Sequence, residues 1–292
     1  MSRNQRPAVV VVGSLHFDIM VDAPRRPRKG ETVTGHAWRP KFGGKGGNQA
    51  VAAAKAGAHA RMAGAVGDDD FGKFLLKALG ESGVDASHVS VLPGTGSGMS
   101  VAISDASGDY GAVIVSGANL KVDAALITSK QLWKGAQVVV LQNEMPETSN
   151  IEAARAARTA GASVCVNAAP YRPLSEEFAS LIDVLVVNAI EAEELSGVPV
   201  SDLKSAARAA AGLIDRFQTV VVTAGGDGVV GLNRGEPPVS LPALPVKLVS
   251  THGAGDAFVG ALAHAMALKQ SLKECLETAN AAAANHVSAP AG

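Results

Sequence analysis

The segment of the chain that points most directly to chemistry is Gly253-Ala254-Gly255-Asp256, which opens a stretch that is apolar on nearly all sides. Such a stretch predicts a buried helix. Small residues at its start let backbone N–H groups converge on an anion, which the helix dipole also favours. The dipole should keep Asp256 ionised, so that this carboxylate can accept a proton from a hydroxyl group. The alternative is that Asp256 only caps the helix.

A second segment, Gly43-Gly44-Lys45-Gly46-Gly47-Asn48, precedes an alanine-rich stretch. Four glycines around a lysine can bring the backbone and an ammonium group close to a polar ligand. The segment lacks the Lys-Ser/Thr pair of a P-loop, and no dinucleotide-binding glycine motif follows the first predicted strand. A flexible turn between a strand and a helix is the alternative.

Other polar residues follow predicted strands. The segment 223–228 is either a cradle for a nucleotide or a tight hairpin. Asn188 and Glu191 have the spacing of a capping box, which favours a structural role. Glu144 stands at the carboxyl end of a strand, the edge where open α/β sheets bind ligands. The seven histidines show no metal-ligand spacing.

The elements that must position these residues alternate along the chain. Uninterrupted apolar runs predict strands of a parallel sheet with both faces covered, at 8–12, 136–141, 162–167, 183–187 and 218–222. Helices are predicted between them, at 48–57, 71–82, 147–161, 175–182 and 201–216. This alternation predicts a doubly wound α/β sandwich.

Two regions interrupt the alternation. Residues 31–41 and 99–116 read as strands with no helix between them, and 105–109 has the composition of a turn. With 16–22 they predict a small antiparallel sheet that forms a lid over a cleft. A plain edge extension or a dimer contact is the alternative. Since no linker or repeat divides the chain, we expect residues 1–292 to form a single domain with this lid.

The composition excludes several classes of protein. Its 26 Lys and Arg against 27 Asp and Glu argue against a nucleic-acid binder recognised by charge. Aromatic residues make up only 4%, which argues against stacking platforms for bases. No stretch has the length of a membrane helix, and the first apolar run, 8–12, is too short for a signal-peptide core. The two cysteines, Cys165 and Cys275, form no disulfide framework, so we expect a cytoplasmic protein.

Taken together and in order, these segments resemble the PfkB carbohydrate kinase family, and most closely its ribokinase branch. Residues 42–50 are similar to the first family signature, and residues 251–258 are similar to the second. Residues 13–18 resemble the family's substrate motif on the first strand. The resemblance extends from about residue 8 to about residue 288, and two signatures in the right order make it specific.

The resemblance implies a ribokinase-like fold, a three-layer α/β/α sandwich with a mostly parallel sheet and a small β-sheet lid. It implies transfer of the γ-phosphoryl group of ATP, with Mg²⁺, to the exocyclic CH₂OH of a furanose, with D-ribose giving ribose 5-phosphate. One alternative is a PfkB kinase of a nucleoside or another sugar. Another is a non-catalytic sugar-binding or regulatory protein. A homodimer through the lid edge stays open, and neither nucleic acid nor membrane is an expected partner.

The resemblance also implies roles for individual residues. Asp256 is the catalytic base, and the backbone N–H groups of Gly253, Ala254 and Gly255 form an anion hole. The implied sugar contacts, besides Asp256, are Ser14, His16, Asp18, Gly44, Lys45, Asn48 and Glu144. The implied nucleotide contacts are Asn188, Thr223, Gly225, Gly228 and Asn280. Glu191 is expected to organise Mg²⁺ through water.

The chain departs from the ribokinase pattern in three places. His16 stands where ribokinases usually carry an asparagine, which alters sugar recognition. Ser250 stands where an aspartate usually helps to hold a monovalent cation. The chain ends before a Gly-Ala segment and a serine that usually complete the cation loop. Backbone carbonyls near Ser250 and His252 could still hold such an ion weakly, so we expect little activation by potassium.

Overall fold

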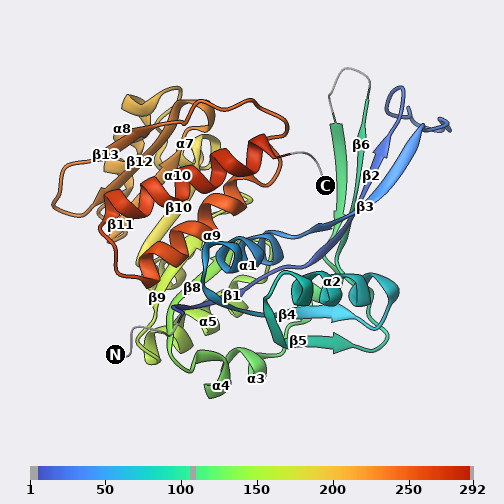
Figure 1. Cartoon of the computed structure of the whole chain (residues 1–292), viewed down its shortest axis with the longest axis horizontal. Coiled ribbons are helices and arrows are strands. Elements are labelled where there is room, and N and C mark those ends of the chain that lie inside the picture. The colour runs from blue at the N-terminus through green and yellow to red at the C-terminus, as the bar shows by residue number, and fades with distance from the viewer. Residues whose placement is uncertain (1–5, 106–109, 290–292) are drawn as a thin grey trace.

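The computed structural model of the protein describes residues 6–105 and 110–289. Within these ranges the strands form a nine-stranded sheet and a separate four-stranded sheet (Figure 1). The nine strands are β1 (Ala8–Val12), β4 (His59–Gly67), β5 (Asp85–Leu92), β8 (Ala136–Gln142), β9 (Ser163–Asn167), β10 (Val184–Asn188), β11 (Thr219–Thr223), β12 (Gly228–Asn233) and β13 (Val239–Pro242). Their order is β13-β12-β11-β10-β9-β8-β1-β4-β5. The pairs β11–β12 and β12–β13 are antiparallel and the others are parallel, which confirms a mostly parallel sheet.

Helices cover both faces of this sheet, so the predicted three-layer sandwich is confirmed. One face packs against α1 (Lys45–Ala56), α2 (Asp70–Glu81), α9 (Ala254–Ala267) and α10 (Leu272–Ser288). The other face packs against α3 (Ala124–Ile127), α4 (Lys130–Trp133), α5 (Glu147–Thr159), α6 (Glu176–Ala179), α7 (Ala189–Ser196) and α8 (Leu203–Leu213). Short 3₁₀ turns occur at Gly117–Lys121 and Gly225–Asp227. None of the described helices has both the length and the apolar character needed to cross a membrane.

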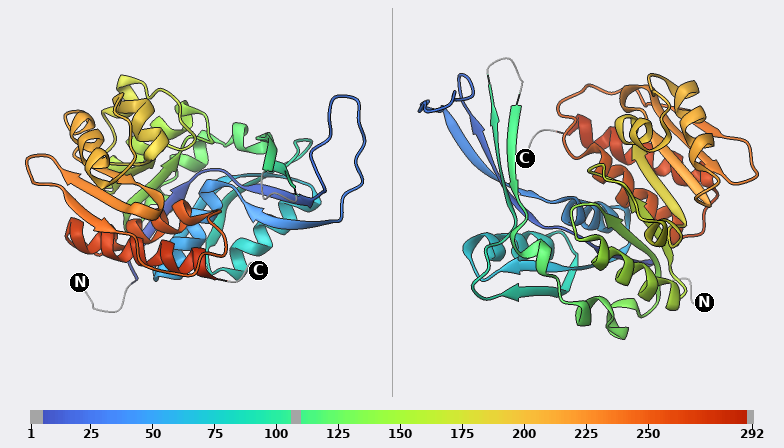
Figure 2. Two further views of the ribbon diagram at one scale, coloured as in Figure 1. Left: turned by 90° about the horizontal axis from the view of Figure 1, so that it is seen from above. Right: turned by 180° about the vertical axis from the view of Figure 1, so that it is seen from behind.

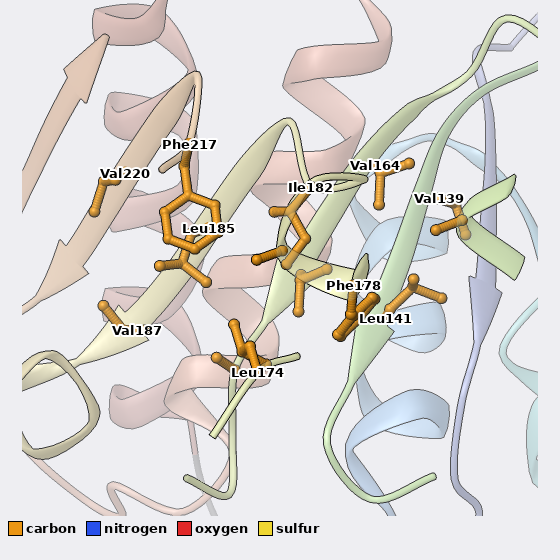
Figure 3. Close-up of a cluster of buried hydrophobic side chains, with 14 of the residues drawn as sticks. Val139, Leu141, Val164, Leu174, Phe178, Ile182, Leu185, Val187, Phe217 and Val220 are labelled. Carbon is orange, nitrogen blue, oxygen red and sulfur yellow. The ribbon is translucent and has the colours of Figure 1, made fainter. Parts of the chain in front are cut away.

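Each face of the sheet has its own hydrophobic core. Figure 3 shows part of the core on the α5 and α8 side, where Phe178 and Phe217 lie among valines and leucines of the strands. Alternate residues of one strand enter different cores, since Val10 belongs to this cluster and Val9 to the opposite one. This explains why the central strands read as uninterrupted apolar runs.

The sequence-predicted elements agree with the structure in most places. The five predicted strands all occur, within one or two residues of their expected ends. Strands β4 and β5 were missed, because β4 is built largely from alanine and glycine and β5 begins with polar residues. The helix expected at 175–182 is only the single turn Glu176–Ala179, since Ile182 enters the core on the way to β10.

The four-stranded sheet contains the strands predicted for the lid, and Figure 2 shows it extending away from the main body. Its strands are β2 (His16–Asp22), β3 (Ala37–Gly43), β6 (Met99–Ser104) and β7 (Tyr110–Val115), in the order β3-β2-β6-β7. The prediction of a purely antiparallel sheet is wrong, because β2 and β6 run parallel. These two strands are far apart in sequence, so no tight turn forces them to be antiparallel.

The strand predicted at 31–41 begins only at Ala37. Its partner β2 ends at Asp22, which pairs with Ala37, and residues 31–36 therefore have no strand to pair with. Residues 106–109, which make up most of the turn predicted at 105–109, lie outside the described part of the chain.

Close contact between α1 and α9 brings together the two segments that the sequence singled out. Gly260 of α9 makes this approach possible, because a Cβ atom there would lie 2.6 Å from the Gln49 carbonyl oxygen and 2.7 Å from the Ala53 nitrogen. Such distances are well inside van der Waals contact, so only glycine fits.

Replacing Gly260 with alanine should therefore force the two helices apart. We expect Gly260→Ala to lower the free energy of unfolding by about 1–3 kcal/mol, the usual cost of overpacking. Chemical denaturation measures this change. Gly80→Ala is the matched control, since Gly80 of α2 faces open space and its replacement should stabilise the helix by up to about 1 kcal/mol. Equal stability changes in the two variants would contradict the proposed contact.

Candidate active site

Asp256 lies in the first turn of α9, and its side chain is held by the start of α1. Its Oδ1 accepts a hydrogen bond from Nε2 of Gln49 at 2.9 Å. Its Oδ2 accepts one from Nδ2 of Asn48 at 3.2 Å. The residue is only 8% exposed. Two amide donors therefore fix the carboxylate in one orientation at the contact between the two helices.

Burial raises the pKa of Asp256, because the charged form loses its hydration. The ammonium group of Lys45 and the amides of Gln49 and Asn48 oppose this effect, while the carboxylate of Glu144 adds to it. The sequence-based expectation that the helix dipole keeps Asp256 ionised is therefore incomplete. Neighbouring side chains also stabilise the charged form of Asp256, and its raised pKa makes it a better proton acceptor than an exposed carboxylate.

The glycines of the second segment let α1 approach the end of β1. A Cβ atom on Gly46 would lie 2.6 Å from the backbone nitrogen of Ser14, and one on Gly44 would lie 2.7 Å from that of His16. Gly44 also has a positive φ of 85°, which disfavours any other residue. The N–H of Gly47 donates to the carbonyl of Ser14 at 2.9 Å. The glycine-rich turn is thus a rigid, close-packed element.

Glu144, which follows β8, joins the same region. Its Oε2 accepts hydrogen bonds from the hydroxyl of Ser14 and from the N–H of Lys45, the latter at 2.9 Å. Nδ1 of His16 lies 3.9 Å from the same oxygen. Nε2 of His16 has no hydrogen-bond partner among the described residues, although this side chain is buried. A buried polar atom without a partner is costly, so His16 is suited to meet a polar group of a ligand.

Asp18 brings the lid strand β2 into this constellation. Its Oδ1 accepts a hydrogen bond from the hydroxyl of Ser100 on the neighbouring strand β6. Burial raises the pKa of Asp18, and the hydrogen bond from Ser100 and the positive charges of His16, His252 and Lys41 oppose the rise. The lid therefore contributes a second buried carboxyl group beside His16 and His252.

Two cavities meet at Gly253 and Asp256. The larger, of about 600 Å³, lies along α1 and α10 and is also lined by Asn48 and His252. The smaller, of about 110 Å³, lies at the ends of β10 and β11 and is also lined by Lys45, Asn188, Glu191, Thr223 and Gly255. Asp256 thus stands between two spaces, an arrangement that suits transfer of a group between two small molecules.

Asn188 and Glu191 form the predicted capping box at the start of α7. The N–H of Glu191 donates to Oδ1 of Asn188, and the N–H of Asn188 donates to Oε2 of Glu191, both at 2.9 Å. Burial raises the pKa of Glu191. The structural role that the sequence offered as an alternative is therefore confirmed, yet both side chains also line the smaller cavity.

The structure separates the remaining predicted residues into groups. Ser14, His16, Asp18, Gly44 and Glu144 gather beside the start of α1 but line neither cavity. The predicted nucleotide contacts Gly225, Gly228 and Asn280 also lie outside both cavities. Gly225 and Gly228 lie in the turn between the antiparallel strands β11 and β12, and Nδ2 of Asn280 donates to the carbonyl of Pro242 at 2.8 Å.

Sequence reasoning missed two residues that hold Asp256 in place. Gln49 is fully buried and donates both to Asp256 and to Oδ1 of Asn167, the second bond at 3.0 Å. Asn167, at the end of β9, donates in turn to the carbonyl of Val186. Gln49 could have been identified from the sequence, because it is a polar residue that directly follows Asn48 in an alanine-rich helix.

The chain is similar to known carbohydrate kinases along nearly its whole length. A sequence model of the pfkB family of carbohydrate kinases matches residues 6–291. The chain is 38% identical to a ribokinase of Mus musculus over 97% of its own length and 89% of that enzyme. It is 34% identical to a deoxyribokinase of Salmonella typhi, over 88% of its length and 84% of that enzyme. The structure of an Arabidopsis thaliana ribokinase complexed with ribose and ATP superposes with a TM-score of 0.91 at 32% identity, covering 99% of this chain and 95% of that one.

Removing the amide of Gln49 should change the acidity of Asp256. Because that hydrogen bond stabilises the carboxylate, Gln49→Leu should raise the pKa of Asp256 further. A pH titration of the ¹³C-labelled aspartate carboxyl signals measures the shift. Gln131→Leu, at an exposed position of α4, is the matched control and should leave the titration unchanged. An unchanged or lower pKa of Asp256 in Gln49→Leu would show that Lys45 and Asn48 alone set the charge state of this carboxyl group.

Proposed function

The chain belongs to the pfkB family of carbohydrate kinases, and from this premise we propose that it transfers the γ-phosphoryl group of ATP to the exocyclic CH₂OH of D-ribose. It is a phosphotransferase with an alcohol group as acceptor. The observation that carries the proposal is the position of Asp256 between two cavities, with the first turn of α9 beside it. The similar Arabidopsis ribokinase forms a complex with ribose and ATP, which supports the choice of both substrates.

Asp256 acts as the base in this proposal. Its carboxylate orients the sugar hydroxyl and takes its proton late in the reaction, since a carboxylate is too weak a base to remove it outright. The hydrogen bonds from Gln49 and Asn48 hold the carboxylate in place for this step. The hydroxyl oxygen forms its bond to the γ-phosphorus, the bond from that phosphorus to the β-phosphate oxygen breaks so that ADP leaves, and Asp256 receives the proton.

The first turn of α9 stabilises the charge that develops on the phosphoryl group. Amides at a helix start have no carbonyl of a preceding turn to bind, so those of Gly253, Ala254 and Gly255 are suited to an anion. The N–H of Ala254 has only one long bond, to the Thr251 carbonyl at 3.3 Å. Because phosphoryl transfer passes through a loose transition state, charge stabilisation and positioning provide most of the catalysis.

We place the phosphates of ATP in the smaller cavity, with Asn188, Thr223 and Lys45 around them. Gly225, Gly228 and Asn280 remain proposed contacts of the rest of the nucleotide. Glu191 fits an indirect magnesium contact, because its Oε2 is used by the capping box and its buried carboxylate lines the same cavity. Magnesium bound with ATP supplies positive charge to the phosphates. Among the described residues no cluster of three metal-ligating side chains offers a direct site, which supports a contact through water.

The sugar lies under the lid in this proposal. Asn48, which lines the larger cavity, and Lys45, which lines the smaller one, are the proposed sugar contacts nearest Asp256. Ser14, Asp18, Gly44 and Glu144 line neither cavity in this structure and remain proposed contacts of the ring hydroxyls. Closure of the lid over the sugar keeps water from competing as the acceptor. The unpartnered Nε2 of His16 gains a hydrogen bond when a hydroxyl group of the sugar reaches it.

We also propose that two copies of the chain pair through their lids. Trp38 of β3 and Val113 of β7 are 66% and 69% exposed, and both strands lie at edges of the lid sheet. Exposed apolar side chains on open strand edges favour association. A monomer in sedimentation at micromolar concentration would contradict this assembly.

The proposed location of the protein is the cytoplasm. ATP is abundant there, and the free thiols of Cys165 and Cys275 stay reduced.

Asp256→Asn keeps the shape of the side chain and removes its basicity. We expect kcat to fall at least about 10²-fold, the usual scale of losing a general base, while binding of the sugar is largely retained. Steady-state kinetics combined with calorimetric titration of the sugar separates the two effects. Turnover close to that of the unsubstituted enzyme would remove Asp256 from the mechanism.

The choice of sugar can be tested with a panel of substrates assayed for release of ADP. A buried partner left without a hydroxyl costs about 1–3 kcal/mol, so a sugar lacking one contacted hydroxyl should lose about 5- to 150-fold in kcat/KM. We expect D-ribose to be the best substrate and 2-deoxy-D-ribose to be weaker. A preference for 2-deoxy-D-ribose would reassign the enzyme to the activity of its deoxyribokinase relatives, and a preference for a nucleoside would indicate the other family alternative.

Potassium should activate this enzyme little. A cation site needs several oxygen ligands, preferably including a carboxylate, and Ser250 offers a neutral hydroxyl that already accepts the N–H of His252 at 3.3 Å. Titration of KCl against a large organic cation at constant ionic strength measures the effect. A saturable rise of about tenfold or more in rate would show that Ser250 and His252 do support a cation site.

A further inference from the structure

The segment that leads into the anion-binding turn is irregular, and its local hydrogen bonds are weak. Residues 243–253, all of them described, form no helix or strand between the end of β13 at Pro242 and the start of α9 at Ala254. The local hydrogen bonds of this segment are long, since the N–H of His252 reaches Ser250 Oγ and the N–H of Ala254 reaches the Thr251 carbonyl, both at 3.3 Å. Contacts from outside the segment must therefore hold it in place.

The last turn of α10 makes these contacts. The carbonyl of Val287 accepts hydrogen bonds from the N–H groups of Val249 at 2.8 Å and of Ser250 at 3.2 Å. Nε2 of His286 lies 2.9 Å from the carbonyl oxygen of His252. Because a carbonyl oxygen can only accept, Nε2 of His286 must carry the hydrogen. This bond, closest to the site, comes from a side chain and can be removed without changing the backbone.

The bond at His252 controls the direction of an anion-binding amide. The carbonyl of His252 and the N–H of Gly253 belong to one planar trans peptide group, in which they point in opposite directions. Fixing the oxygen therefore fixes the N–H. Gly253 also leaves the space that the imidazole needs, because a Cβ atom there would lie 2.9 Å from Nε2 of His286. Its φ of 85° further favours glycine.

The same contact uses an oxygen that a monovalent cation near this loop could otherwise bind. The resemblance to ribokinases implies an ion near Ser250 and His252, held partly by backbone carbonyls. Here the carbonyl of His252 is taken by His286 and that of Val287 by two N–H groups. The hydroxyl of Ser250 already accepts the N–H of His252. These oxygens already accept hydrogen bonds within the protein, which leaves them fewer lone pairs for an ion.

We propose that His286 is a positioning residue that replaces a bound cation, holding the His252–Gly253 peptide so that the Gly253 N–H faces the transferred phosphoryl group. It acts through the backbone of the loop, by its hydrogen bond to the His252 carbonyl. Its effect on turnover rests on the proposed kinase activity, whereas its effect on the order of the loop does not.

Three substitutions of His286 separate hydrogen bonding from packing. His286→Ala and His286→Leu remove the donor, and His286→Gln keeps an N–H donor without the ring. We expect kcat to fall about 3- to 10-fold in the first two, the scale of one lost hydrogen bond, with KM for D-ribose changed less than about twofold. His286→Gln should recover at least half of the lost rate. His59→Ala, which removes an exposed histidine at the far end of β4, is the matched control and should behave like the unsubstituted enzyme.

Free imidazole provides a sharper test. His286 lines the cavity of about 600 Å³, so the space left by alanine is accessible to a small molecule. Millimolar imidazole should restore the rate of His286→Ala, whereas His286→Leu, which fills the same space, should not respond. Equal rates in all variants, or a loss that neither glutamine nor imidazole reverses, would overturn the proposal.

Hydrogen exchange of the free protein tests the same role without catalysis. Amides of residues 249–255 should exchange about 3- to 10-fold faster in His286→Ala than in the unsubstituted protein, and amides of α1 should not change. If the unsubstituted protein fails to phosphorylate any sugar, the proposed function fails while this exchange still decides the role of His286. Unchanged exchange in residues 249–255 would contradict it.

Discussion

The contact between the starts of α1 and α9 is the interaction on which the site depends. It joins two segments that are about two hundred residues apart, and it places the carboxylate of Asp256 between the amides of Asn48 and Gln49. Gly260 permits the approach from the side of α9, and Gly46 permits the approach of α1 to Ser14. The glycines of both segments are therefore needed to bring the elements together, besides any direct contact with ligands.

This arrangement gathers three carboxyl groups, two of them buried and one partly buried. Asp18, Glu144 and Asp256 come from the lid, the main sheet and α9, and the first and third have pKa values raised mainly by burial. Lys45 and Lys41 supply opposing charge, and amide or hydroxyl donors bind the carboxylate oxygens. The result is a polar site with fixed orientations inside an otherwise apolar sandwich, which suits recognition of a sugar and acceptance of its proton.

The sequence predicted the family, the layered fold and a small separate sheet, because parallel strands with two covered faces and paired signatures are strong local signals. It did not predict the direction of β6 relative to β2, which depends on long-range pairing. It also missed the strand β4, which is built largely from alanine and glycine. In the site, Asp256 and Asn48 stand out by their motifs. Gln49 and His286 do not, because their roles arise only when α9 and α10 pack against the rest of the chain.

The most direct test of phosphoryl transfer at Asp256 is to identify the product rather than the rate. The protein is incubated with ATP, Mg²⁺ and D-ribose carrying ¹³C at its exocyclic carbon, and the mixture is followed by ³¹P and ¹³C NMR. We expect a phosphomonoester coupled to that labelled carbon, formed in the same amount as ADP. Release of inorganic phosphate without a sugar phosphate, or a phosphate on a ring hydroxyl, would contradict transfer between the two cavities at Asp256.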